Sequence, residues 1–475
     1  MTDRVLRLTV PVAIVFLSLA AAAVAVFRPG YLTNAHDLGV LIFLQVIVAA
    51  LWKYRQVYFP VMLTVFLFAG LDLAVASAFL DARWMVLAVG ALAGYAIYMR
   101  DRSHYFGLFH LVALFCIVSS FASVVVSWYP HVALLKAISL LLLFLYCAAG
   151  GRLAILHREE AFVSGLLIGC EVITYASAAS TYVLHIGIFG NPNSLGAVMG
   201  IVVIPVLLWG VLVAQRPQLA QRRTVALLVA LSLLLSSFAR AGITAAAVVF
   251  VILCLGLRRY RLLVKGSVVA VLMAILILVV SPPEEYDGEN SHGVVSAFVY
   301  KGKRDMGVLG SRRTAWQHTM GVIAQNPWFG SGFGTSLTAA EEQMQLVALA
   351  SAPEATREHG SSYLAILEWV GVLGVVPFFA LVFLSASNAV RVLTWMRRTG
   401  AISSPAVPIA LVIAAGLVHA AFEDWLFAAG YYMSPLFWSF AFVCVDMIRE
   451  IEAHQRAVPL AAYGWAEISP LVAKS

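Results

Sequence analysis

The sequence predicts an all-α polytopic integral membrane protein with about 12–14 transmembrane helices and one large periplasmic loop domain between the eleventh and twelfth spans. Three observations lead to this fold class. The chain is 62% apolar and only 12% charged, with a mean hydropathy of +0.92. Apolar runs of about 20 residues, long enough to cross about 30 Å of hydrocarbon, recur along it. One long polar connection separates two of these runs. Because ordinary soluble domains carry about a quarter charged residues, a soluble enzyme, a disordered protein and a secreted disulfide scaffold are excluded.

The apolar runs define the expected spans in order. Their centres lie near residues 17, 45, 68, 91, 115, 140, 172, 204, 230, 249, 271, 374, 413 and 435. The first run follows two arginines and resembles a signal peptide, but it is long enough to span, so we interpret it as a membrane helix. The expected organisation is N-terminal spans over 1–185, central spans over 186–280, the loop domain over 281–362, C-terminal spans over 363–446 and a tail over 447–475.

Basic residues indicate the orientation of the chain. They gather in alternate connections, as they do on the cytoplasmic side of membrane proteins. The opposite connections hold few of them. We therefore expect both termini in the cytoplasm and assign the net charge of +7 to these connections, not to a nucleic-acid partner. The basic connections contain Lys53, Arg55, Arg100, Arg102, Arg152, Arg158, Arg216, Arg222, Arg223, Arg258, Arg259, Arg261, Lys265, Arg391, Arg397 and Arg398.

Two cations near the outer face are candidate ligands for an anion. Arg240 lies in the segment SSFARAGITA, a tight turn whose small residues allow another group to approach its guanidinium. A planar, permanently charged guanidinium suits a phosphate or pyrophosphate, although an arginine that snorkels to the interface is the alternative. Lys136 lies about one and a half turns after Pro130 and could reach the same anion.

The long outer connection contains a predicted helix followed by a glycine-rich turn. Ser311 is a plausible N-cap, and the helix runs to about Ala324, which places Arg312 and Trp316 on one face. Arg313 would replace Arg312 if the register differs by one residue. The segment NPWFGSGFG over 326–334 ends the helix. Its aromatic residues, with Trp316, are predicted to be exposed and to stack on sugars or lie at the bilayer surface.

Two further segments contain candidate residues. His359, at the entrance of the next apolar helix, could accept a proton from an alcohol, and Glu358 could do the same. In the segment GNPNSLG over 190–196, Asn193 and Ser194 are expected to cap a helix whose exposed amides favour an anion. Other charges at the membrane edge, including Glu423 and Asp424, cannot be paired from the sequence. No metal-ligand cluster or nucleotide motif is present in the sequence, so we expect neither a metal nor a cofactor.

In combination these motifs resemble the O-antigen ligase and O-antigen polymerase superfamily. The motifs are SxxR followed by a small residue (Ser237, Arg240), Arg-x3-Trp (Arg312, Trp316), the NPWxGxGxG segment, and a histidine followed by YLxxLExxGxxG. The segment GNPNSLG is similar to a subgroup concerned with exopolysaccharides. The match extends over about 190–374; the remaining segments match only as hydrophobic spans.

The resemblance implies a metal-independent glycosyltransferase at the periplasmic face of the bacterial inner membrane. Its donor would be an undecaprenyl-pyrophosphate-linked glycan, and its acceptor a second glycan or the lipid A core. Membrane lipids and other polysaccharide-assembly proteins would be partners, and nucleic acid would not. The exopolysaccharide-like segment slightly favours a polymerase over a ligase. A flippase for lipid-linked oligosaccharides is the alternative, but a flippase should show related halves and charges near the midplane.

By carry-over, Arg240 and Arg312 would bind the pyrophosphate and His359 would act on the acceptor hydroxyl. The usual family pattern is HN-x-YL, with the histidine three residues before the aromatic. Here His359 is four residues before Tyr363, and Gly360 replaces the asparagine. The base therefore stays open between His359 and Glu358, and a mechanism without a general base is the third option.

Overall fold

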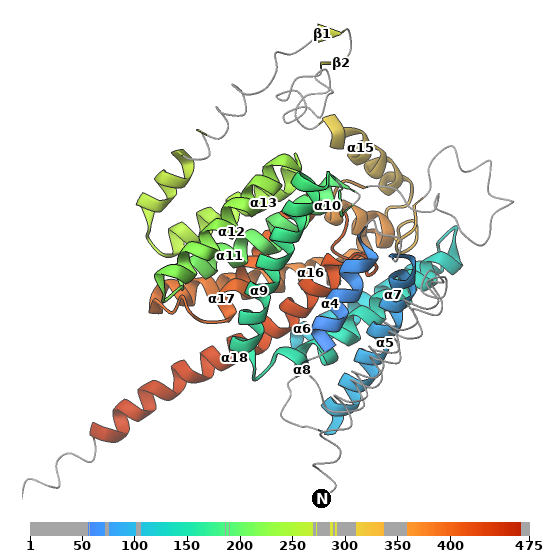
Figure 1. The fold of residues 1–475 in the computed structure, drawn as a ribbon. Coiled ribbons are helices and arrows are strands. Elements are labelled where there is room, and N and C mark those ends of the chain that lie inside the picture. Colours follow the sequence, from blue (N-terminus) through green and yellow to red (C-terminus); the bar gives the residue numbers. More distant parts are fainter. Residues whose placement is uncertain are drawn as a thin grey trace, which may run out of the picture.

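A computed structural model confirms an α-helical membrane architecture for the described part of the chain (Figure 1). The structure describes residues 56, 58–71, 76–100, 106–185, 187–189, 191–268, 272, 286–287, 290–291, 310–336 and 359–466. Within these ranges, six helices are long and apolar enough to cross a membrane: Ala78–Tyr95, Pro130–Ile155, Glu159–Val183, Pro192–Leu212, Pro217–Ser236 and Ser362–Thr399.

The helices follow the apolar runs of the sequence. Every expected centre falls inside a described helix except those near 17, 45 and 271, which lie outside the described residues. A pair of two-residue antiparallel strands, β1 (Tyr286–Asp287) and β2 (Asn290–Ser291), lies in the long connection. The helices are α4 (Tyr58–Ala69), α5 (Ala76–Arg100), α6 (Leu108–Val124), α7 (Pro130–Tyr146), η2 (Cys147–Gly151), α8 (Arg152–Ile155), α9 (Glu159–Ala178), η3 (Ala179–Val183), α10 (Pro192–Ala197), η4 (Val198–Val203), α11 (Ile204–Leu212), α12 (Pro217–Ser236), α13 (Arg240–Gly256), α15 (Gly310–Gln325), α16 (Ser362–Thr399), α17 (Ala406–Ala420) and α18 (Met433–Ala466).

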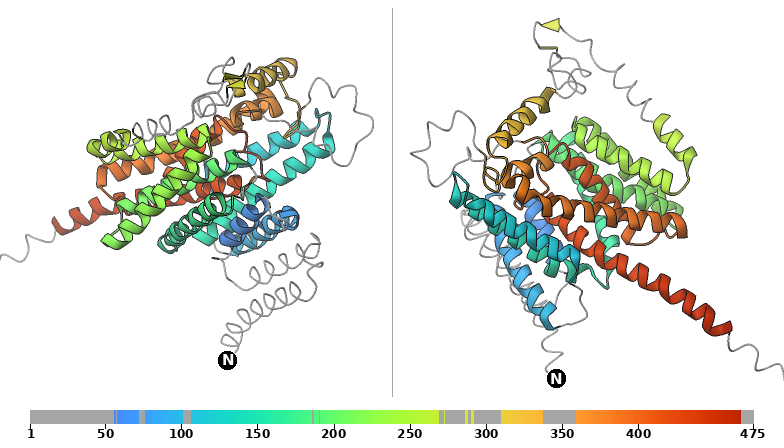
Figure 2. Two further views of the ribbon diagram at one scale, coloured as in Figure 1. Left: turned by 45° about the horizontal axis from the view of Figure 1, so that its top comes forward. Right: turned by 180° about the vertical axis from the view of Figure 1, so that it is seen from behind.

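The centre of the bundle is formed by α17 and by the continuous segment from α10 to α11. Nearly every side chain of α17 is buried, and 83% of the window in Pro192–Leu212 is buried inside the protein. Close packing against α13 depends on glycines, because a Cβ on Gly200 would lie 2.6 Å from the Cα of Gly242. Small residues at such crossings let two backbones approach, as is usual between membrane helices. In both views of Figure 2, α18 projects from this bundle.

The long helix α16 is interrupted at Gly371, whose φ of +67° and ψ of −178° are not helical. The break leaves the N–H groups that follow it without intrahelical acceptors. Val372 donates instead to the Pro327 carbonyl at 2.8 Å, and Leu373 to the Trp328 carbonyl at 3.2 Å. A Cβ on Gly371 would lie 2.4 Å from the Trp328 carbonyl atoms, so this contact requires glycine.

The carbonyl groups before the break are satisfied by the same glycine-rich segment. The Ser331 N–H donates to the Glu368 carbonyl at 2.8 Å, and the Gly332 N–H to the Trp369 carbonyl at 3.1 Å. Ser123 of α6 donates a further bond to the Trp369 carbonyl at 2.7 Å. Irregular backbone in a membrane protein must be satisfied in this way. Segment 326–336 is therefore fixed to both halves of α16.

Two local predictions are corrected by the structure. Phe333 is not exposed: it is only 2% accessible and packs against Trp369 and Phe378, at ring-centroid distances of 5.5 Å and 6.2 Å. Its neighbours in the sequence suggested a surface turn, but the bonds to α16 turn the segment inward. The N-cap of α10 is Asn191, not Asn193 or Ser194, because its side chain accepts the Asn193 N–H at 2.8 Å.

Candidate active site

His359 lies at the N-terminal end of α16, between two carboxylates. Its Nδ1 is 2.9 Å from Oδ2 of Asp424, and its backbone N–H donates to the same oxygen at 2.8 Å. Its Nε2 is 3.4 Å from Oε1 of Glu368 and makes no hydrogen bond within the described part of the chain. The side chain is only 2% exposed. Asp424 therefore fixes the ring, and Nε2 is the nitrogen that can exchange a proton.

The two carboxylates control the protonation of this histidine. Burial by itself lowers the pKa of His359, but the hydrogen bond to Asp424 and the nearby carboxylates of Glu368 and Asp424 outweigh it and raise the pKa above 6.5. The opposite balance holds for Asp424. Burial raises its pKa, but the bonds from the ring and backbone of His359 lower it below the ordinary value of 3.8. The pair therefore favours an imidazolium beside a carboxylate.

Arg312 enters the site from α15, which lies outside the main bundle in Figure 1. Its guanidinium is largely buried and forms an ion pair with Glu423, the residue next to Asp424. Ser362 fixes that segment, because its N–H and its Oγ both donate to the Glu423 carbonyl, at 3.1 Å and 2.6 Å. Arg313 is exposed, so Arg312 is the arginine of this helix that faces inward.

Gly360 allows α15 to pack against the start of α16. Its φ is +69°, and an added Cβ would lie 3.1 Å from Nε1 of Trp316 and 3.2 Å from Cδ of Arg312. The Trp316 Nε1–H donates to the Gly360 carbonyl at 3.1 Å. The prediction that Arg312 and Trp316 share one helix face is thereby confirmed. Glycine at this position, where the family pattern has asparagine, leaves space for both side chains.

Arg240 begins α13 and lies near Arg312, whose positive charge acts on its guanidinium. The predicted tight turn is confirmed, since α12 ends at Ser236 and α13 starts at Arg240. This turn packs on α10, because a Cβ on Gly196 would lie 2.0 Å from the Cβ of Ala239. Two cations from distant segments are thus brought to one region of the molecule.

The remaining predicted residues lie at the margin. Lys136 of α7 is exposed and runs past the end of the glycine-rich segment, where a Cβ on Gly334 would lie 3.0 Å from its Cβ. Asn193 is partly exposed in α10. Glu358 lies outside the described residues. The structure therefore brings Arg312 and His359 together, with Arg240 near Arg312, and leaves Lys136 and Asn193 at the edge.

Three carboxylates of the site were not assigned from the sequence. Glu368, Glu423 and Asp424 were visible only as charges near membrane-spanning runs, which is the signal by which such residues can be suspected. Their partners could not be deduced, because Asp424 follows His359 by 65 residues and Glu423 follows Arg312 by 111. The ion-pair partners of these carboxylates are seen only in the folded chain.

The fold and this site define a class: a polytopic membrane protein with a buried histidine between carboxylates and two arginines nearby. Residues 224–379 match the family model of O-antigen ligase, and this segment contains Arg240, Arg312, Trp316 and His359. This match supports the resemblance of the chain to the O-antigen ligase and polymerase superfamily. No curated protein matches the sequence.

Proposed function

We propose that the protein is a glycosyltransferase that transfers or polymerises glycan carried on undecaprenyl pyrophosphate, at the periplasmic face of the bacterial inner membrane. The proposal is supported by the placement of Arg312 next to the buried pair of His359 and Asp424, with Arg240 near Arg312; Arg240, Arg312 and His359 lie inside the family-matched segment. A polymerase acting in surface-polysaccharide synthesis is favoured over a ligase, on the exopolysaccharide-like segment 190–196.

The two guanidiniums would bind the pyrophosphate of the donor. Charge-assisted, bidentate bonds from arginine match phosphate oxygens and strengthen as the leaving group gains charge. Arg312 is already oriented by Glu423, so its geometry is set before the donor binds. Arg240, at the start of α13, contributes a second positive charge near Arg312. The guanidiniums thus supply positive charge of the kind that a metal ion supplies in other transferases.

His359 would act as the general base. Its Nε2 accepts the proton of an acceptor hydroxyl as the acceptor oxygen bonds to the anomeric carbon of the donor. The bond from that carbon to the phosphate oxygen breaks, and the carrier pyrophosphate leaves with the electron pair. Asp424 holds Nδ1 and stabilises the imidazolium that forms. The buried Glu368, 3.4 Å from Nε2, adds a second negative charge to that stabilisation.

An apolar groove next to the site fits the isoprenoid chain of the carrier. A cavity of about 530 Å³ lies between α6 and α16, and it includes Phe329 of the glycine-rich segment and Leu373 just after the break in α16. The lining side chains are almost all apolar, so the groove suits a hydrocarbon chain. Filling it with Val118→Trp should raise the KM for a long-chain donor and leave a short-prenyl analogue unaffected. Equal effects on both donors would exclude this use of the groove.

The proposed function is tested by the glycans of cells carrying Arg240→Ala or Arg312→Ala. Each change should reduce glycan assembly by about 10²–10³-fold, the usual effect of removing a group that stabilises transition-state charge. The exposed Arg313→Ala is the matched control and should behave as wild type. Single repeats remaining on the carrier would identify a polymerase, and long chains accumulating on the carrier would identify a ligase.

The alternative, a transporter, makes a different prediction. Purified protein in vesicles would then move a lipid-linked glycan across the bilayer without changing its length. Turnover of the donor by purified protein supports the transferase. Normal glycans in both arginine variants, at normal protein levels, would exclude the assigned role of these arginines.

A further inference from the structure

A second cavity lies between the ends of α13 and α16 that are remote from the candidate site. Its volume is about 660 Å³, within the range of ordinary ligand pockets. Arg240 and His359 lie at the beginnings of these two helices, whereas the cavity is lined at their ends. The lining residues are Gly256, Leu257, Arg258, Thr394, Met396, Arg397, Arg398 and Gly400.

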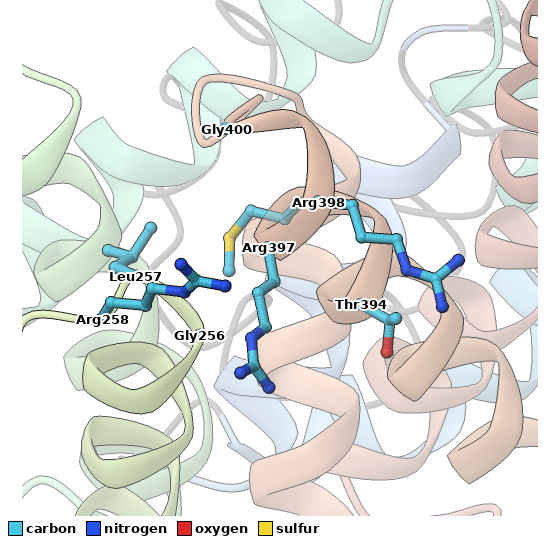
Figure 3. A pocket seen from close by; sticks show the side chains of 8 residues that line it. Gly256, Leu257, Arg258, Thr394, Arg397, Arg398 and Gly400 are labelled. Atoms are coloured by element: carbon cyan, nitrogen blue, oxygen red, sulfur yellow. The ribbon is translucent and has the colours of Figure 1, made fainter.

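Three arginines line this cavity without an acid among the lining residues. Figure 3 shows the guanidiniums of Arg258 and Arg397 extending into the space between the two helix ends, with that of Arg398 beside Thr394. All three arginines are exposed, and across the described ranges no ion pair involves them. Two segments far apart in the sequence therefore bring positive charge to one cavity. Such a site attracts an anion with more than one acceptor oxygen.

The backbone at Arg258 is unusual for an arginine. The end of α13 closes with bonds from the Arg258 N–H to the Leu255 carbonyl at 3.2 Å and from the Arg259 N–H to the Cys254 carbonyl at 2.9 Å. This is a Schellman cap, in which the left-handed position is normally glycine. Here that position is Arg258, with φ of +54°. The folded chain accommodates this left-handed backbone, and the side chain of Arg258 lines the cavity.

The end of α16 has the usual residue, glycine, at the left-handed position. Its left-handed residue is Gly400, with φ of +74°, whose N–H donates to the Met396 carbonyl at 2.8 Å. Arginines near helix ends interact favourably with the carbonyl dipoles, and that effect alone accounts for basic residues there. It does not require three arginines around one cavity, and a bound anion explains that arrangement.

Exposed apolar side chains approach the cavity along the same helices. Leu255 is 44% exposed on α13, and Val390 is 61% exposed one turn before Thr394 on α16. In a membrane-spanning bundle such side chains face lipid. A ligand with a phosphate at the helix ends and hydrocarbon along the helix sides fits this arrangement. A free phosphate would contact the arginines but not the apolar side chains.

We infer that this cavity binds the headgroup of an anionic phospholipid, in the leaflet opposite to the candidate active site. The three guanidiniums contact the phosphate oxygens, and the acyl chains lie along α13 and α16. A lipid with two phosphate diesters matches the charge of the cavity better than one with a single diester. Basic pockets between membrane helices are a general means of recognising such lipids. The inference does not depend on the proposed glycosyl transfer.

Lipid binding by the purified full-length protein tests this inference. Cardiolipin, phosphatidylglycerol and phosphatidylcholine are added in neutral detergent, and bound lipid is counted by native mass spectrometry, with thermal unfolding in parallel. Cardiolipin should bind best and phosphatidylcholine least. Arg258→Gly combined with Arg397→Gln should weaken cardiolipin binding by at least about tenfold, since each removed charge near a membrane surface contributes about fivefold. Glycine retains the left-handed cap, so the double variant should still fold.

The matched control is Arg259→Gln, which removes a neighbouring charge that does not line the cavity; it should bind cardiolipin as wild type does. Unchanged cardiolipin binding in the double variant would overturn the inference, as would equal loss in the Arg259 control. Stabilisation by inorganic phosphate alone, equal to that by cardiolipin, would overturn the lipid assignment in favour of a free-phosphate site.

Discussion

The two ends of α13 and α16 use positive charge in different ways. At the candidate active site, Arg312 is paired with Glu423, and His359 lies between Asp424 and Glu368. At the other end, the arginines of the second cavity have no acidic partner within the described residues. An acidic partner fixes the orientation of a cation and offsets the free-energy cost of burying its charge. Exposed arginines without partners keep their charge available for a ligand. Under the two proposals made above, the paired cations serve chemistry and the unpaired ones serve recognition of a ligand.

The largest effect is expected from the histidine between the carboxylates. His359→Gln should lower the transfer rate by about 10²–10⁴-fold at neutral pH, the usual contribution of a general base. The chemistry needs the neutral ring, and the carboxylates raise the pKa of His359, so wild-type activity should rise with pH through a value above 6.5. Glu368→Gln removes one cause of this rise and should move the acid limb of the pH–rate profile to lower pH.

A merely structural role for Glu368 would lower the rate without moving the profile, so the pH dependence distinguishes the two roles. A wild-type rate in His359→Gln would show that His359 is not the base. Arg313→Ala is again the matched control, because Arg313 is exposed and on the same helix as Arg312. It should change neither the rate nor the pH profile.

The second effect compares two arginines that lie on the same predicted side of the membrane. Arg152 is 1% exposed, forms a bidentate pair with Asp446, and contacts Nε2 of His110 at 3.0 Å. Arg152→Gln leaves a buried carboxylate without its cation and should lower the free energy of unfolding by about 3–5 kcal/mol. Arg397→Gln removes an exposed charge and should change it by less than about 0.5 kcal/mol in detergent without anionic lipid. Denaturant unfolding followed by tryptophan fluorescence measures both, and similar losses would contradict the comparison.

Much of the fold could be predicted from local sequence, because each span is a local property. Runs such as Pro130–Ile155 are recognisable from length and hydropathy alone. The helix from Gly310 to Gln325 and the turn before Arg240 also follow from local caps and periodicity. The break at Gly371 could not be foreseen, because the apolar pattern continues through it. The break depends on segment 326–336, which is distant in the sequence and provides hydrogen-bond partners for the backbone groups of α16 on both sides of Gly371.

The candidate site was predictable only in part, for the same reason. The sequence motifs indicated Arg240, Arg312 and His359, each of which lies at or just before the start of a helix. Asp424 and Glu423 lie in the connection between α17 and α18, and no local pattern relates them to those residues. Phe333 was misplaced because a glycine-rich segment normally lies at the surface, whereas here its backbone bonds to α16 draw it into the core.

The smallest expected effect is that of Arg258→Gly, which tests the second cavity directly. Arg258 occupies a left-handed position that costs a non-glycine residue about 1–2 kcal/mol, and glycine is free of that strain. Arg258→Gly should therefore raise the free energy of unfolding by about 1 kcal/mol in detergent without anionic lipid, after the greater entropy of glycine in the unfolded chain is subtracted. Adding cardiolipin should stabilise the wild type more than the variant and so reduce or reverse the difference. A variant that is less stable without lipid would mean that Arg258 supports the fold itself. A gain that persists unchanged with cardiolipin would mean that the strained arginine has no lipid to bind.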